Sequence, residues 1–169
     1  MSGNLAIIIM GAKSDYPHAE NIIEWLDYFG LRHETRIASA HKTPEKLLAL
    51  LADQEASDDN VAYITIAGLS NALSGMVDFA TAFPVIACPP PCDAFGGADI
   101  FSSLRMPPGV AAATITEPRN AAFFAAKLFA AGDESIRARI LAYHAEQRLK
   151  IDRDEESLRA IPEGKGATR

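Results

Sequence analysis

The chain has 169 residues, 49% of them hydrophobic, and a formal net charge of −6. This length fits one domain with a substantial core, while the negative charge argues against nucleic acid or an anionic membrane as the main partner. No apolar run approaches the ~18–20 residues of a membrane span, and Leu5–Met10 is too short for the apolar region of a signal peptide. We therefore expect a cytoplasmic protein.

The first third of the chain predicts strands that alternate with helices. Leu5–Met10 is a continuous apolar run, which is typical of a strand that is covered on both faces. Pro17 near its start and Gly30 just past its end bracket a helix over about 16–29. The strand predicted over 32–38 is less apolar, so we expect it near an edge of the sheet.

The same alternation continues from Thr43, which we expect to be the N-cap of a helix with Pro44 as its first residue and an end near Glu55. The other predicted elements are strands at 61–66, 84–88 and 109–114, and helices from 71 or 72, near 99–104 and over 118–131. This order predicts an α/β three-layer sandwich around a central parallel sheet, of the flavodoxin-like or Rossmann-like type, with a further C-terminal helix.

The last predicted helix runs from Glu134 to about Arg159 and differs in composition from the rest. It is highly charged, and its apolar stripe of Ile136, Ile140, Tyr143 and Ile151 is thin. We expect it to pack on a neighbouring subunit; a solvated helix on its own core is the alternative. The chain thus divides into a catalytic domain at 1–132, a helical extension at 133–161 and a disordered tail at 162–169.

Three loops rich in small and hydroxyl residues follow predicted strands, at the sheet edge where parallel α/β proteins bind ligands. The first contains Gly11, Ala12, Ser14 and Asp15. Its small residues and the helix N-terminus behind them favour a phosphate, and Asp15 is a candidate acceptor for ribose hydroxyls. Alternatively, Ser14 and Asp15 only cap the helix. The loop matches neither a dinucleotide nor a nucleoside-triphosphate motif.

The second loop contains Ser39, His41 and Lys42 and is the most informative part of the chain. His41 is a candidate general acid and base, because the ordinary pKa of histidine lies near 6.5. Lys42 is a candidate partner for a phosphate or a carboxylate. The other three histidines, His18, His33 and His144, fall on predicted helix or edge-strand positions and are given no role.

The third loop contains Gly68, Leu69, Ser70 and Asn71, which offer amides and hydroxyls without charge. They suit a neutral heterocycle or a carboxyl group. No carboxylate and histidine cluster has metal-ligand spacing, so we expect no metal.

Outside the three loops, we expect Cys88 and Cys92 to be reduced thiols. Arg105 is equally compatible with a bound anion and with an exposed surface position.

Together these motifs, from about Ile7 to Ala131, resemble the catalytic protein of purine biosynthesis that places a carboxyl group on C4 of aminoimidazole ribonucleotide. The family has a mutase class, which starts from the N5-carboxyamino ribonucleotide, and a class that takes carbon dioxide directly. The mutase has an arginine at Lys42, a histidine at Ala72, a proline at Ser74 and a glutamine at Arg105. These differences, and Ala87-Cys88-Pro89-Pro90, resemble the direct carboxylase.

The resemblance implies roles for the loops. The phosphate would lie near Ser14 and Ala12. Many relatives have serine at the position of Ala12, so in this chain only the backbone N–H of Ala12 remains to bind the phosphate. Asp15 would contact the ribose. His41 and Lys42 would lie beside the imidazole, and the third loop would bind the new carboxylate. It also implies a homo-octamer and no cofactor, ATP or biotin. The alternatives are mutase activity and a non-catalytic module that binds a phosphorylated ligand.

Overall fold

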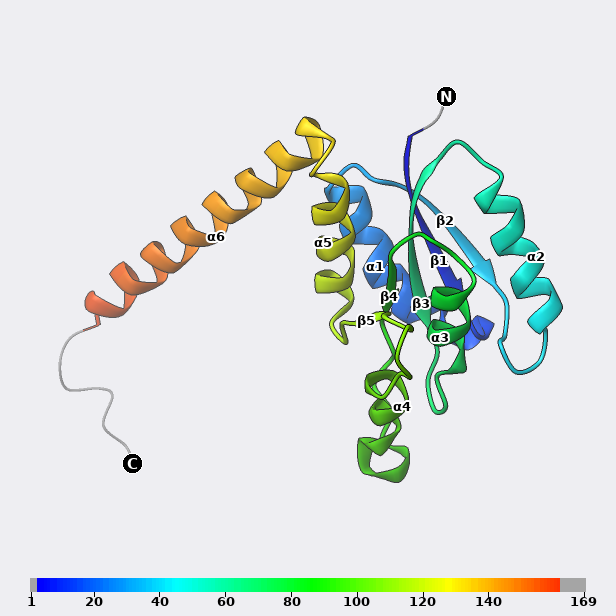
Figure 1. Cartoon of the computed structure of the whole chain (residues 1–169). Helices are drawn as coiled ribbons and strands as arrows, with labels where there is room; N and C mark the ends of the chain where they lie inside the picture. The colour runs from blue at the N-terminus through cyan, green and yellow to red at the C-terminus, as the bar shows by residue number, and fades with distance from the viewer. Residues whose placement is uncertain (1–2, 162–169) are drawn as a thin grey trace.

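The computed structural model describes residues 3–161 and contains one five-stranded sheet (Figure 1). All neighbouring strands are parallel, in the order β2-β1-β3-β4-β5. The strands are β1 (Asn4–Met10), β2 (Arg32–Ile37), β3 (Asn60–Ile66), β4 (Val85–Ala87) and β5 (Ala113–Thr114). This confirms the predicted α/β sandwich and the predicted edge position of β2.

Helices cover both faces of the sheet, and β1 shows why. Its side chains alternate between two cores: Ala6, Ile8 and Met10 lie in one, and Leu5, Ile7 and Ile9 in the other. The first core is covered by α1 (Tyr16–Tyr28) and α5 (Pro118–Phe129), the second by α2 (Pro44–Glu55) and α3 (Ala72–Phe79). Each fully buried isoleucine contributes about 1.5–3 kcal/mol relative to exposure, so β1 is the centre of the fold.

The strand predicted over 109–114 is mostly absent, since β5 contains only Ala113 and Thr114. Gly109 has φ +90° and the N–H of Val110 donates to Pro107 O (3.1 Å), which makes a turn. The N–H of Ala111 then donates to the Asp78 carboxylate (2.7 Å) instead of to a strand.

A projecting arm precedes this turn, formed by the 3-10 helix η2 (Ala94–Ile100) and the short helix α4 (Phe101–Leu104). It extends beyond the carboxyl edge of the sheet (Figure 1). The sequence predicted only its second half. Phe95 has φ +53° and is 87% exposed, so the tip presents an aromatic ring to solvent.

The last helix, α6 (Glu134–Arg159), leaves the domain at an angle (Figure 1). Its first turns are anchored, because Ile136 and Ile140 are 3% and 6% exposed within the core under α1 and α5. Tyr143 packs edge-on against Trp25, with 5.6 Å between ring centroids. The expectation that Ile136 and Ile140 pack on a neighbouring subunit is wrong, because their own domain buries them, while Tyr143 packs on the same core and stays partly exposed.

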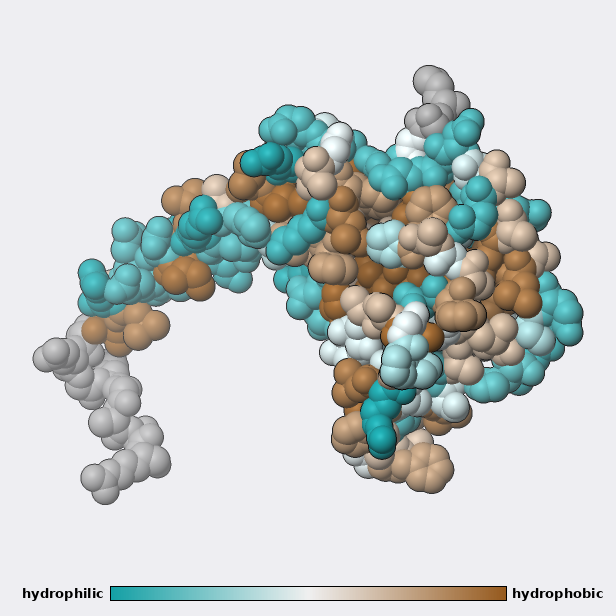
Figure 2. Space-filling view, viewed as in Figure 1, coloured by the Kyte–Doolittle hydropathy of each residue, from teal (hydrophilic) through white to brown (hydrophobic). Residues whose placement is uncertain are grey.

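Beyond His144 the helix is exposed and largely hydrophilic, with isolated apolar patches (Figure 2). Leu149, Ile151 and Leu158 are each more than half exposed. The predicted tail at 162–169 lies outside the described residues. Within residues 3–161, none of the helices has the length and apolarity that crossing a membrane requires.

Candidate active site

The loops that follow β1, β2 and β3 enclose a cleft of about 410 Å³. Because β1 lies between the other two strands, the three loops are neighbours at the carboxyl edge, where the order of the sheet reverses. The volume suits a small-molecule ligand. Every residue that the sequence assigned to the site lines this cleft except Asn71. Among the described residues that line it, His41 is the only histidine.

The first loop closes on itself through Asp15. The Asp15 carboxylate accepts a hydrogen bond from the N–H of Ala12 at 3.0 Å, and the N–H of Asp15 donates back to Ala12 O at 3.2 Å. This is the capping alternative for Asp15. It also occupies the Ala12 N–H that was expected to meet the phosphate. The first amides of the 3-10 turn η1 (Lys13–Asp15), those of Lys13 and Ser14, have no partner within the turn and are the donors that remain there.

The second loop is held by Ser39 and Thr43. Thr43 is the N-cap residue of α2 and Pro44 its first residue, as expected, but the Thr43 side chain makes no capping hydrogen bond: its hydroxyl accepts from the N–H of Ser39 (2.9 Å), while its own N–H donates to Ser39 O (2.9 Å). The N–H of Lys42 donates to Ser39 Oγ at 3.3 Å. These bonds fold the backbone into a tight turn from which His41 and Lys42 project as exposed side chains.

The third loop carries the one non-glycine residue of the cleft lining with a left-handed backbone: Leu69 has φ +59° and is 59% exposed. Gly68 and Ser70 flank it in the lining. Asn71 does not reach the cleft, because its side chain is 4% exposed and caps α3 by accepting from the N–H of Ser74 at 3.1 Å. Its predicted contact with a substrate carboxylate is therefore replaced by a structural one.

A histidine and a cysteine that the sequence left without a role lie together behind the first loop. His18 Nε2 is 3.4 Å from Cys88 Sγ. Burial raises the pKa of the Cys88 thiol to about 12, so the thiol is protonated at neutral pH, and burial also lowers the pKa of His18. Both cysteines are free, as predicted. The sequence alone contains no signal for this pair, which forms only when the residue that follows β4 is brought against α1.

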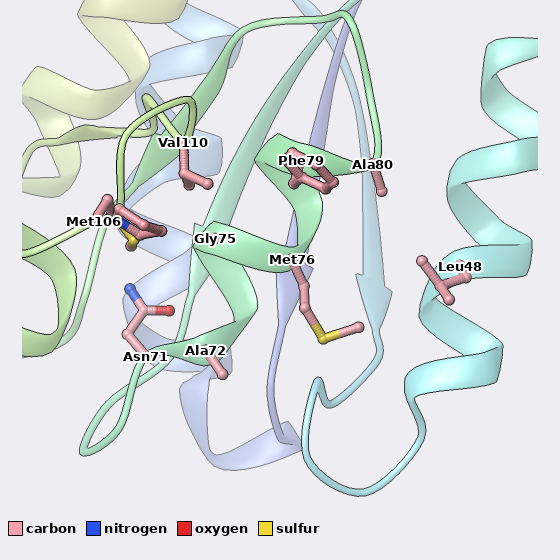
Figure 3. Close-up of a pocket in the computed structure, with 10 residues that line it drawn as sticks. Leu48, Asn71, Ala72, Gly75, Met76, Phe79, Ala80, Met106 and Val110 are labelled. Atoms are coloured by element: carbon pink, nitrogen blue, oxygen red, sulfur yellow. The ribbon is translucent and has the colours of Figure 1, made fainter.

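Another hollow, along α3, is apolar and lies apart from the cleft. Figure 3 shows its walls, with Leu48 on α2 facing Met76 and Phe79 on α3, and with Asn71 and Met106 at its other end. It lacks ionisable side chains among its described lining residues. We locate the chemistry in the polar cleft for that reason. No group of three or more metal-ligating side chains occurs within residues 3–161.

Comparison with known proteins places the chain in a family. The family model described as AIR carboxylase matches residues 5–150. A phosphoribosylaminoimidazole carboxylase of Archaeoglobus fulgidus is 50% identical over 157 residues, which cover 93% of this chain and 86% of that protein. The crystal structure of Treponema denticola PurE has a TM-score of 0.90 at 48% identity, covering 92% of this chain and 98% of that one.

A more distant relative is a longer protein. The bifunctional phosphoribosylaminoimidazole carboxylase/phosphoribosylaminoimidazole succinocarboxamide synthetase of Mus musculus is 37% identical over 136 residues, which are 80% of this chain but 32% of that protein. The match thus covers a single part of it. On the family model, the sequence identities and the shared fold, this chain belongs to the AIR carboxylase family.

Proposed function

We propose that the enzyme carboxylates aminoimidazole ribonucleotide directly at C4 with carbon dioxide. The observation that carries this choice over mutase activity is Ala72, at the position where the mutase has its second histidine. Ala72 lines the hollow along α3, and within the described cleft lining His41 is the sole imidazole. Lys42, in place of the mutase arginine, supports the same class.

The cleft supplies what this reaction needs. The imidazole ring of the substrate is an electron-rich enamine, so C4 attacks carbon dioxide and forms the new carbon–carbon bond, while a carbon–oxygen π pair becomes the carboxylate charge. C4 then carries an extra proton, which His41 removes, and the released electron pair restores the aromatic ring. The enzyme's main contribution is to hold two weakly associating reactants together.

The other loops are assigned by their chemistry. The amides of Lys13 and Ser14 would bind the phosphate, since helix N-termini favour anions. Lys42 would neutralise the carboxylate as it forms, and the Gly68–Ser70 backbone and hydroxyl would hydrogen-bond it. Asp15 keeps one carboxylate oxygen, Oδ1, for a ribose hydroxyl while Oδ2 caps the turn.

A paired assay tests the function. Purified protein is given aminoimidazole ribonucleotide with bicarbonate, without ATP, and separately the N5-carboxyamino ribonucleotide. We expect carboxylation of the first compound. If the N5-carboxyamino compound is converted far faster than it decays to the free amine, and the free amine is inert, the enzyme is a mutase. If the protein converts neither compound, the remaining interpretation is a non-catalytic module that binds a phosphorylated ligand.

The assembly is a second proposal: a homo-octamer in which the outer part of α6 packs on a neighbouring subunit. The exposed Leu149, Ile151 and Leu158 support it, because each would gain about 1.5–3 kcal/mol if fully buried. A chain that ends at Arg148 keeps the anchored turns and removes these side chains. Light scattering should show a smaller particle for it; an unchanged octamer would disprove the contact.

A further inference from the structure

We infer that Asn71 is a positioning residue, which with Ser102 and Ser103 on α4 fixes the third loop against the cleft without touching the substrate. This inference rests on the proposed function only in taking the cleft as the reaction site. It gives the projecting arm a role in the chemistry, since the arm supplies both serines.

Both polar atoms of the Asn71 amide have hydrogen-bond partners inside the protein. Its Oδ1 accepts from the N–H of Ser74 at 3.1 Å and from the Ser74 hydroxyl at 2.9 Å, and its Nδ2 donates to Ser103 Oγ at 2.9 Å. With 4% exposure, the side chain has no route to a ligand in the cleft. An amide held at both ends permits one orientation of the backbone that carries it.

Ser102 holds the loop on both sides of Ser70. Its hydroxyl accepts from the N–H of Asn71 at 3.0 Å, and its single proton is shared between two carbonyl oxygens, Asp99 O at 2.7 Å and Leu69 O at 3.0 Å. The residue between these two contacts, Ser70, therefore cannot move independently of the arm.

The conformation of Leu69 is the second independent sign that the loop is held. Its φ of +59° is uncommon for a residue with a side chain, and such outliers persist only where the surroundings over-determine them. Leu69 and Ser70 both line the cleft on which His41 also opens. The unfavourable backbone thus lies at the reaction site, at the residue whose carbonyl oxygen is 3.0 Å from Ser102 Oγ.

The network continues to the sheet, which provides a rigid reference. Ser74 Oγ, whose own proton goes to Asn71 Oδ1, accepts from the Thr65 hydroxyl on β3 at 2.8 Å, and Ile86 O on β4 lies 3.3 Å from the same Thr65 Oγ1. Thr114 on β5 donates to Ser103 O at 3.0 Å. Thr65, Ser74 and Ser103 are all buried, so their hydrogen bonds are not exchanged with water. The loop is therefore placed relative to three strands at once.

Two variants test the inference. Asn71→Ser keeps an oxygen for the N–H of Ser74 but is too short to reach Ser103, and Ser102→Ala removes the bridge across Ser70. Displacing a reacting group by about 1 Å costs roughly 10- to 100-fold in rate, so we expect kcat to fall about tenfold or more in both. The phosphate loop is outside the network, so KM for the ribonucleotide should change by less than about threefold.

The matched control is Thr81→Val, beyond the far end of α3, which removes a hydroxyl hydrogen bond to Glu55 and leaves the loop intact. Its kcat should stay within about twofold of the wild type. Rates are compared as ratios, on whichever of the two ribonucleotides the wild-type enzyme converts. A wild type that acts only on the N5-carboxyamino compound would overturn the proposed function and leave this ratio measurable.

Two results would overturn the inference. Folded Asn71→Ser and Ser102→Ala enzymes with wild-type kcat would show that the network does not position the loop. A raised KM with unchanged kcat would show that Asn71 serves ground-state binding. If Asn71→Ser fails to fold, Ser102→Ala and Ser103→Ala decide the matter, because each removes a single hydroxyl.

Discussion

Ile140→Ala measures how firmly α6 is attached to its own domain. Ile140 is 6% exposed and lies in the core formed with α1 and α5. The substitution removes three carbons at about 0.8 kcal/mol each, and the cavity that remains adds to this loss. We therefore expect the free energy of unfolding to fall by about 2–4 kcal/mol. Leu149→Ala is the matched control on the outer part of the helix, since Leu149 is 56% exposed.

Urea unfolding at several protein concentrations separates the two positions. The loss from Ile140→Ala should be the same at every concentration, because the contact lies within one chain. The loss from Leu149→Ala should appear only where the protein is associated, since a contact between subunits contributes by mass action. An effect of Ile140→Ala that disappears on dilution would refute the reasoning and return this residue to a subunit interface.

Three further outcomes follow from single residues. Gly30→Ala should lower the unfolding free energy by about 1–2 kcal/mol, because Gly30 has φ +70°; unchanged urea unfolding would contradict it. The pKa of buried Cys88 is raised to about 12 from an ordinary value of 9, so its contribution to stability is complete below pH 9 and is lost between pH 9 and 12. From pH 8 to 10.5 the wild type should lose roughly 1–2 kcal/mol more than Cys88→Ala, measured by urea unfolding, and equal losses would rule this out. His41→Asn should keep the fold and the KM but reduce kcat by about 100-fold or more; steady-state rates near those of the wild type would eliminate His41 as the proton carrier.

Local patterns were enough to predict most of the fold. The apolar run of β1 and the proline and glycine residues that bracket α1 are signals contained in a few neighbouring residues. The three loops meet because parallel strands share one carboxyl edge, so order along the chain was sufficient to bring His41 and Leu69 to one cleft. The spacing of apolar residues along a strand or helix can be read from the sequence without knowing which element packs against them.

The hydrogen-bond partners within the site were not predictable in the same way. Asn71 was assigned to a substrate because its partner, Ser103, comes from a distant segment of the chain. The residue type of Thr43 correctly predicts the N-cap position of α2, but not that its hydroxyl accepts from the Ser39 N–H instead of capping the helix. A polar side chain forms a hydrogen bond with whichever donor or acceptor the fold brings nearest. That partner depends on the three-dimensional structure and cannot be read from neighbouring residues.

The anchoring of α6 was missed for a related reason. Its apolar stripe is thin when judged by periodicity alone, but Tyr143 meets the ring of Trp25 from α1 and that of Phe123 from α5. Aromatic pairs stabilise beyond the area that they bury. A few side chains are enough to anchor the helix when the surface against which it packs is aromatic. The sequence of the helix itself does not show that its partner surface is aromatic.

The central position of β1 has a consequence for how the chain reaches its native state. β1 pairs on one edge with β2 and on the other with β3, and at least one helix separates the paired strands along the chain. Until Asn60–Ile66 is added, the run Leu5–Met10 presents an unpaired edge rich in isoleucine. Parallel sheets with such distant pairings fold slowly, and exposed apolar strands aggregate meanwhile. Refolding yield should therefore fall steeply as the concentration of unfolded chain rises.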